Sequence, residues 1–314
     1  MKQLTPVSSV AAAHAASATQ THGKTSEHTL RAACLHTAIV AIRSLHAEIM
    51  LFPKPGLVSP VDNGSHTDMD MALFMRSLFS LRHYFVRMAQ AGARDTAFAQ
   101  LKVLGMQAER RMLGATQGVN THRGAIFALG MLCAAAGYCH AHARPLSADS
   151  IRQTVMAQWG DALIMHSMPS AASLPSHGTR VASLYAVGGA REEGAKGFPA
   201  VFEIGLPQIL KSLRRDATPA MAQIDALFAL MAYMTDTNIY HRAGAAGAHL
   251  VKLSAQSFIA QGGTAAPAWK AAACACHRLF VSKRLSPGGA ADMLAASWFV
   301  FQISASCARL TEQD

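Results

Sequence analysis

The sequence is poor in charged residues, aromatic residues and cysteine. Charged side chains make up 15% of the 314 residues and aromatic side chains 7%, whereas 51% of the residues are hydrophobic. This balance excludes a globally disordered chain, which would have fewer apolar residues and a higher density of charge. The length suffices for one large domain or two domains of ordinary size.

The cysteines are too few and too scattered to form a disulfide framework. The chain has six of them, at Cys34, Cys133, Cys139, Cys274, Cys276 and Cys307. Histidines accompany cysteines at residues 139–142 and 274–277, but these spacings match no common zinc site. Buried cysteines with incidental histidines are the simpler interpretation.

Targeting and membrane-spanning segments are also missing. The first thirty residues are rich in Ala, Ser, Thr and His and lack the continuous apolar stretch of a secretory signal. Residues 124–137 and 293–308 are the most apolar stretches, and their length or polar content is typical of buried core helices. We expect a cytoplasmic protein with no membrane partner and a disordered tail over residues 1–28.

The net charge is strongly positive, at +10. Such a surface suits a nucleic acid, an anionic membrane or a small polyphosphate ligand such as ATP or coenzyme A. The basic residues are dispersed and no aromatic stripe lies among them, which argues against a nucleic-acid partner.

Alanine, leucine and methionine supply most of the apolar content, which favours close-packed helices over a β-sandwich. Apolar residues at helical spacing predict helices near residues 29–50, 67–91, 95–113, 125–140, 147–159, 181–185, 201–213, 220–234, 243–261, 266–279 and 289–310. The predicted fold is therefore all-α, a single multi-helix domain over residues 29–314 with functional loops at the ends of helices.

Polar loops interrupt these helices, and the first holds two closely spaced carboxylates. Asp68 and Asp70 could share Mg²⁺ if the backbone there is extended, whereas on a regular helix they would point in different directions. The structural alternative is a capping box, in which Thr67 caps the following helix and Asp70 lies in its first turn.

Two further loops carry groups that could hold phosphate. In the loop 118–124, exposed amides with His122 and Arg123 could bind phosphate oxygens, the alternative being a polar turn with Thr121 as helix cap. In the loop 188–199, Arg191 could form paired hydrogen bonds to phosphate and Glu193 could serve as a base or a metal ligand. Local ion pairs on a solvated surface are the alternative there.

Each of the last two polar blocks, taken alone, is typical of the residues that begin or end a helix. They are Asp236-Thr237-Asn238 with Arg242, and residues 286–292. Asp292 lies near a predicted helix start, where a carboxylate needs no catalytic explanation.

Taken in order, the polar blocks resemble the triphosphoribosyl-dephospho-CoA synthase family. The resemblance rests on Glu48 and on residues 53–58, 63–70, 118–127, 191–199, 236–242 and 286–292. It departs from the family pattern at Arg123, where lysine is expected, and at Ser65 and Gly194, where alanine is expected. These changes preserve charge or small size.

The resemblance implies a transferase that joins ATP and 3′-dephospho-CoA. The ribose 2′-hydroxyl of dephospho-CoA attacks C1 of the ATP ribose, adenine leaves, and a triphosphoribosyl adduct forms. This adduct is the prosthetic-group precursor for the acyl carrier protein of malonate decarboxylase or citrate lyase, and a separate transferase attaches it. The absence of a fused second domain favours the malonate decarboxylase type. A homodimer would suit a helical protein.

The resemblance also implies the site residues. The catalytic candidates are Glu48, His66, Asp68, Asp70, His122, Glu193 and Asp236, and the substrate-binding candidates are Lys54, Asn120, Thr121, Arg123, Arg191, Lys196 and Arg242. Mg²⁺ would bind Asp68 and Asp70. The base, or an additional metal ligand, would be Glu48, Glu193 or Asp236, and the histidines would contact phosphate or adenine. A non-catalytic polyanion-binding protein and an adenine-releasing hydrolase are the alternatives.

Overall fold

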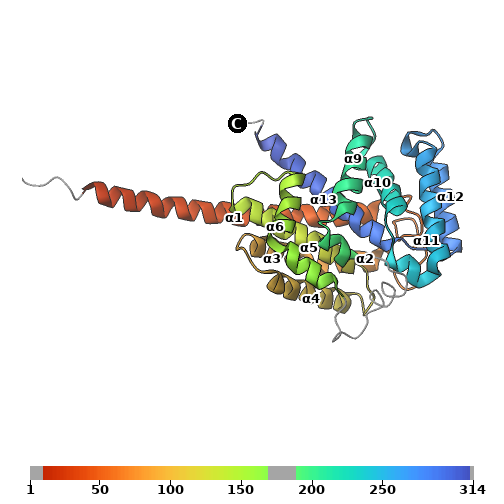
Figure 1. Ribbon diagram of the computed structural model, residues 1–314, viewed down its shortest axis with the longest axis horizontal. Coiled ribbons are helices and arrows are strands. Elements are labelled where there is room, and N and C mark those ends of the chain that lie inside the picture. Colours follow the sequence, from red (N-terminus) through yellow and green to blue (C-terminus); the bar gives the residue numbers. More distant parts are fainter. Residues whose placement is uncertain (1–9, 169–188, 312–314) are drawn as a thin grey trace, which may run out of the picture.

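The computed structural model describes residues 10–168 and 189–311, and these residues form helices and loops without a β-strand (Figure 1). The elements are α1 (Val10–Met50), α2 (Met71–Ser80), α3 (Arg82–Gly92), α4 (Phe98–Ala115), α5 (Arg123–Ala141), α6 (Ala148–Ser167), α8 (Ala190–Ala195), η1 (Ala200–Gly205), α9 (Leu206–Leu213), α10 (Pro219–Tyr233), α11 (Thr237–Ala260), η2 (Gly263–Ala265), α12 (Trp269–Ser282) and α13 (Gly288–Thr311). The all-α prediction is confirmed. The short helix expected at 181–185 lies outside the described residues.

Helix α5 forms the centre of the fold, with α1, α3, α6 and α13 packed around it. It is buried on nearly all sides, because apolar and small residues occupy every face of the helix rather than one stripe. In the described part of the chain it is the single helix long and apolar enough to cross a membrane, and 72% of that stretch is buried inside the fold. Such burial is typical of the core helix that the sequence predicted there.

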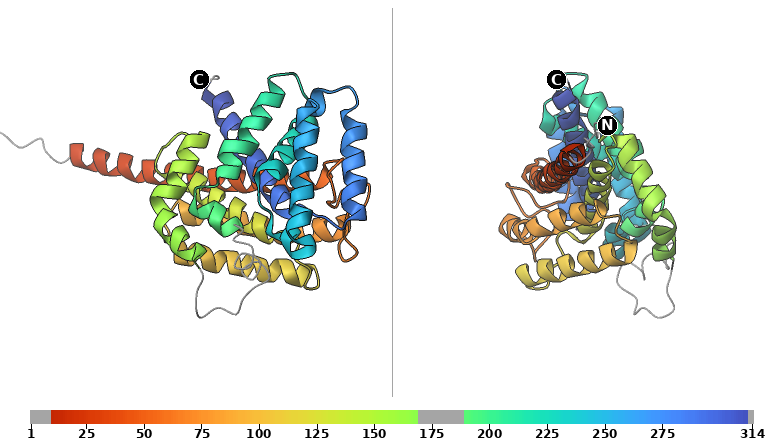
Figure 2. Two further views of the ribbon diagram at one scale, coloured as in Figure 1. Left: turned by 45° about the vertical axis from the view of Figure 1, so that its right-hand side comes forward. Right: turned by 90° about the vertical axis from the view of Figure 1, so that its left-hand side faces the viewer.

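Helix α1 contributes its C-terminal half to the core. From residue 27 onward, where its side chains are described, the first buried one is Cys34, and Ala38, Leu45 and Ile49 are buried farther along the helix. The N-terminal half projects beyond the other helices (Figures 1 and 2). The helix therefore begins well before residue 29, where the sequence predicted it to start.

The helix predicted over residues 67–91 starts later and is broken in the middle. Residues before Met71 are not helical, and the Asp70 carboxylate caps α2 by accepting a hydrogen bond from the amide of Leu73. The expected cap at Thr67 is therefore wrong. A turn at Leu81 separates α2 from α3 and lets α3 lie against α5.

Two irregular helices adjoin the polar loops. Element η1 is a π-helix that follows α8, and such segments occur often at functional sites. Helix α11 breaks at Gly244, whose φ of 62° is outside the helical region. Gly244 directly follows Ala243, where the sequence predicted this helix to begin.

Candidate active site

Three of the predicted polar blocks meet at the start of α13. His66 Nε2 lies 2.7 Å from Ser286 Oγ, and Arg242 Nη2 lies 3.3 Å from His66 Nδ1. The amide of Gly289 donates to Asp236 Oδ2 at 2.7 Å. These contacts join segments that are far apart in sequence into one site.

The centre of this site holds a buried ion pair. Lys54 Nζ donates to Glu48 Oε1 and to the Glu48 carbonyl oxygen, each at 2.7 Å, and only 2% of Lys54 is exposed. A lysine at this depth requires such partners, because an unpaired buried ammonium is costly. Lys54 therefore fixes Glu48 at the end of α1. The substrate-binding role expected for Lys54 stays a prediction.

A third carboxyl group lies beside Glu48 and Asp236. It belongs to Asp292 on α13, which accepts a hydrogen bond from the amide of Ala125 at the start of α5. Loss of solvent around this carboxyl raises the pKa of Asp292 well above its ordinary value, and the charges of Glu48 and Asp236 raise it further. A carboxyl group whose pKa is raised in this way is suited to the role of a general acid.

Asp292 is absent from the candidates that the sequence suggested, because its position near a helix start explained it without chemistry. It faces the start of a different helix, α5, and a side chain at Gly124 would clash with it. A Cβ there would lie 2.1 Å from Asp292 Oδ2. The glycine in the loop 118–124 was the available signal, although nothing in the sequence links it to Asp292.

His122 presents an unpaired ring nitrogen. Its Nδ1 lies 2.6 Å from Ser77 Oγ, which accepts a hydrogen bond from Thr121, and this chain favours a proton on Nε2. Nε2 has no partner among the described residues, and the residue is 2% exposed. Burial, with the nearby charge of Lys54, lowers the pKa of His122 to about 3. The ring is therefore neutral, and its Nε2 is left without a hydrogen bond by the part of the chain that the structure describes.

His66 is held by three side chains. Besides Ser286 and Arg242, the Asp68 carboxylate lies 3.6 Å from its Nδ1. Burial lowers the pKa of His66, Arg242 lowers it further, and Asp68 opposes the change. Because Arg242 donates to Nδ1, the proton of the neutral ring lies on Nε2 and is donated to Ser286.

Asp70 meets the backbone condition set for a shared Mg²⁺, with extended angles of φ −132° and ψ 176°, whereas Asp68 lies in a bend. Both carboxylates are exposed, and one oxygen of Asp70 is used by Leu73. No group of three or more His, Cys, Asp or Glu that could hold a metal exists in the described ranges. An ion bound by these two carboxylates would need most of its ligands from water and phosphate, a coordination that Mg²⁺ commonly has.

The basic residue at the start of α5 is engaged elsewhere. Arg123 forms an exposed ion pair with Glu109 of α4 at 2.6 Å. Asn120 Oδ1 accepts a hydrogen bond from the amide of Arg123, whereas Thr121 donates to Ser77. The alternative that Thr121 caps α5 is therefore wrong.

The residues of α8 form a separate group. Glu193 accepts a hydrogen bond from the amide of Ala200 in η1, and burial raises the pKa of Glu193. Arg191 lies near His166 of α6, whose pKa burial lowers to about 4 with a further contribution from Arg191. Lys196 is exposed at the end of α8. The contacts of α8 are thus with η1, α6 and α5.

The side chains of Thr237 and Asn238 lie outside the described residues.

Comparison with known proteins bears on this site. The CitG family model, described as ATP:dephospho-CoA triphosphoribosyl transferase, matches residues 34–309. No solved structure matches the chain significantly.

Three curated relatives are each named as a probable 2-(5''-triphosphoribosyl)-3'-dephosphocoenzyme-A synthase. One from Acinetobacter calcoaceticus is 38% identical over 84% of this chain and 90% of its own length. One from Stutzerimonas stutzeri is 40% identical over 85% and 91%, and one from Vibrio cholerae is 34% identical over 84% and 87%. The chain therefore belongs to the ATP:dephospho-CoA triphosphoribosyl transferase family, a family of transferases.

Proposed function

We propose that this protein transfers the triphosphoribosyl group of ATP to the 2′-hydroxyl of 3′-dephospho-CoA. The new bond joins the hydroxyl oxygen to C1 of the ATP ribose, and the bond from C1 to adenine breaks. The hydroxyl loses one proton and the departing adenine gains one. The observation that carries this proposal is the group of three carboxyls, Glu48, Asp236 and Asp292, within the span that matches the family.

The three carboxyls have different surroundings, and we assign them different roles. Glu48 is held by Lys54 and stabilises positive charge that develops on the ribose ring. Asp236, fixed by the amide of Gly289, accepts the hydroxyl proton. Asp292 favours the protonated form and supplies the proton to adenine.

The triphosphate is not cleaved, so the protein has only to hold it. Arg242 and the His66 ring lie beside Asp68 at the open side of the site, and His122 offers its unpaired Nε2. Mg²⁺ on Asp68 and Asp70, when bound, neutralises phosphate charge. Arg191 and Lys196 supply further positive charge from α8.

The product has a defined use in this proposal. It is the precursor of the prosthetic group on the acyl carrier protein of malonate decarboxylase, or of citrate lyase, and a separate transferase attaches it. Synthesis of this adduct and its attachment are separate reactions, so a purified carrier protein is not needed for the first test.

The test is a reaction of purified protein with ATP, Mg²⁺ and dephospho-CoA, followed by chromatography and mass spectrometry. We expect free adenine and a triphosphoribosyl adduct in equal amounts. Adenine without adduct would identify a hydrolase. A folded protein that yields neither would favour a polyanion-binding protein.

A variant tests the assignment of Asp292. Asp292→Asn keeps the shape of the side chain but cannot deliver a proton, so kcat should fall by about 100-fold or more. Stability should not fall, because the neutral amide also avoids repulsion from Glu48 and Asp236. Asp161→Asn, at an exposed position on α6, is the control. An Asp292→Asn protein with the kcat of the control would remove Asp292 from the reaction.

A further inference from the structure

The loop that carries Lys54 has no regular secondary structure, yet much of it is buried. Residues 53–59 are buried without forming a helix. Buried backbone groups need hydrogen-bond partners, and a loop cannot supply all of them from within itself. The partners here come from α12 and from the connection between α12 and α13.

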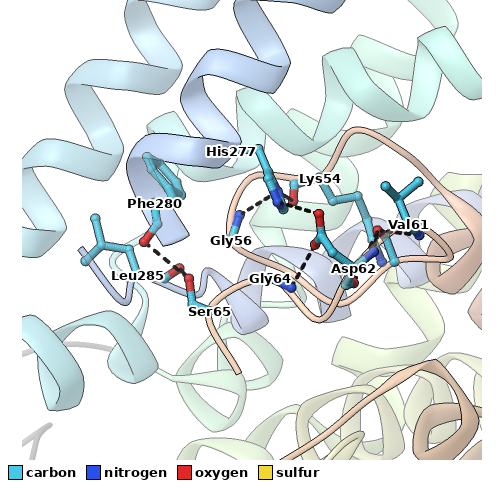
Figure 3. A network of polar contacts seen from close by, with 10 residues as sticks. Lys54, Gly56, Val61, Asp62, Gly64, Ser65, His277, Phe280 and Leu285 are labelled. Carbon is cyan, nitrogen blue, oxygen red and sulfur yellow. Dashed lines mark hydrogen bonds and ion pairs between the residues drawn. The ribbon is translucent and has the colours of Figure 1, made fainter. Parts of the chain in front are cut away.

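The main fastening of this loop is a single histidine ring on α12. His277 Nδ1 lies 2.9 Å from the carbonyl oxygen of Lys54 and 3.3 Å from the amide nitrogen of Gly56. Its Nε2 lies 3.1 Å from Asp62 Oδ2 (Figure 3). One ring therefore contacts two separate segments of the loop, residues 54–56 and residue 62.

A second fastening keeps the loop close to the same helix. Ser65 Oγ donates to the carbonyl oxygens of Leu285, at 2.6 Å, and Phe280, at 3.2 Å (Figure 3). Gly56 has a left-handed φ of 68°, and a Cβ there would lie 2.0 Å from the Leu285 carbonyl oxygen. The loop and the end of α12 thus approach each other backbone to backbone, which leaves the His277 ring little freedom to move.

We propose that His277 is a positioning residue for Lys54 and, through it, for the Glu48 carboxylate. The backbone of Lys54 is held on one side by the His277 ring, and its side chain reaches Glu48 on the other. A shift of the Lys54 carbonyl would move the ammonium group away from Glu48. Among the described ion pairs, Lys54 is the one cation that contacts the Glu48 carboxylate. The role follows from geometry and rests on the proposed function only for its effect on turnover.

Two substitutions separate positioning from general support of the fold. In His277→Asn the amide group reaches the position of Nδ1, so the contact with the Lys54 backbone is kept and the contact with Asp62 is lost. In His277→Gln the longer side chain reaches Asp62, and the Lys54 carbonyl oxygen keeps only the amide of Leu57 as a partner. Trp269→Leu, at the start of α12 and packed against the core, is a control that lowers stability without touching the loop.

The experiment measures the rate at which acetic anhydride acetylates Lys54 in the native proteins, by mass spectrometry, together with melting temperature and kcat. Lys54 should be protected in the wild type, in His277→Asn and in Trp269→Leu, because it is 2% exposed. In His277→Gln its acetylation should be at least about tenfold faster, and kcat should fall at least about tenfold with KM for ATP little changed.

The outcomes separate this inference from the proposed function. Equal protection of Lys54 in both His277 variants, or exposure in proportion to melting temperature across all variants, would overturn the positioning role. Faster acetylation in His277→Gln alone supports the positioning role even if the wild type forms no adduct, in which case the proposed function fails. If His277→Gln does not fold, His277→Ala removes the contact with the Lys54 backbone as well as the contact with Asp62, and it should expose Lys54 more than His277→Asn and Trp269→Leu do.

Discussion

Asp70 combines two properties that most substitutions would change together. Its carboxylate caps α2, and it is one of the two proposed Mg²⁺ ligands. Serine is also a good helix cap but lacks the charge. Asp70→Ser should therefore keep the stability of the wild type and lose most activity at low Mg²⁺, whereas Asp70→Ala should also lose about 1 kcal/mol of stability.

Chemical denaturation and adduct formation across a Mg²⁺ series measure these effects. Asp149→Ser, near the start of α6 where Ser147 provides the cap, is the matched control. Full activity of Asp70→Ser at all Mg²⁺ concentrations would leave capping as the only role of Asp70.

His122 makes stability depend on pH in a predictable direction. Its folded-state pKa is about 3, below the ordinary value near 6.5, so the unfolded chain binds a proton first as the pH falls. Its contribution is fully present above about pH 6.5 and is lost on acidification toward pH 3. Each proton taken up only by the unfolded state lowers the free energy of unfolding by about 1.4 kcal/mol per pH unit.

Denaturant titrations between pH 4.5 and 7.5 test this dependence. In His122→Gln the free energy of unfolding should decline less steeply with acidification than in the wild type, by about one proton. His249→Gln, at an exposed position on α11, should keep the wild-type slope. Identical slopes in all three proteins would contradict a neutral, buried His122.

At the scale of elements, the contact between α3 and α5 depends on two glycines. A Cβ at Gly92 would lie 1.8 Å from the Ala134 carbonyl oxygen, and one at Gly137 would lie 1.9 Å from that of Ala89. These atoms are helix backbone and cannot rotate away. Gly92→Ala and Gly137→Ala should each destabilise the protein by about 1–3 kcal/mol or more.

Gly114 provides the comparison for this prediction. It lies in α4 with no atom within 4 Å of the position that a Cβ would take. Gly114→Ala should raise stability by up to about 1 kcal/mol, because alanine is the better helix former. Thermal denaturation compares the melting temperatures of the three variants with that of the wild type. A stabilising effect of Gly92→Ala would rule out the close approach of α3 and α5.

The positions of helices could be predicted from the sequence where the helical preference of a segment agrees with its packing in the fold. The helices expected near 95–113, 125–140, 220–234 and 266–279 correspond to α4, α5, α10 and α12. The break at Leu81 could not be predicted, because residues on both sides have helical spacing and only the approach to α5 requires the turn. The shift of the cap from Thr67 to Asp70 depended on the path of the loop before it.

At the scale of the whole molecule, the projecting half of α1 is separable from the rest. The family model begins at residue 34, which is also the first buried side chain among those described in α1, from residue 27 onward. Deletion of residues 1–28 should therefore leave melting temperature and adduct formation unchanged. A large loss of either would mean that the N-terminal half of α1 has a partner, such as a second copy of the chain, and sedimentation velocity of both forms would then show whether a dimer is lost.

The sequence by itself determined the all-α class, the approximate helices and the family. Helical periodicity and the ordered polar blocks can be read along the chain without knowing which residues meet. Only the tertiary structure decided which charged groups are buried and paired. Lys54 pairs with Glu48, and Asp292 of α13 accepts a hydrogen bond at the start of α5. His277 contacts the backbone of Lys54, which is 223 residues away in sequence. Desolvation and pairing depend on these long-range contacts, and they set the proton affinity and orientation on which the chemistry depends.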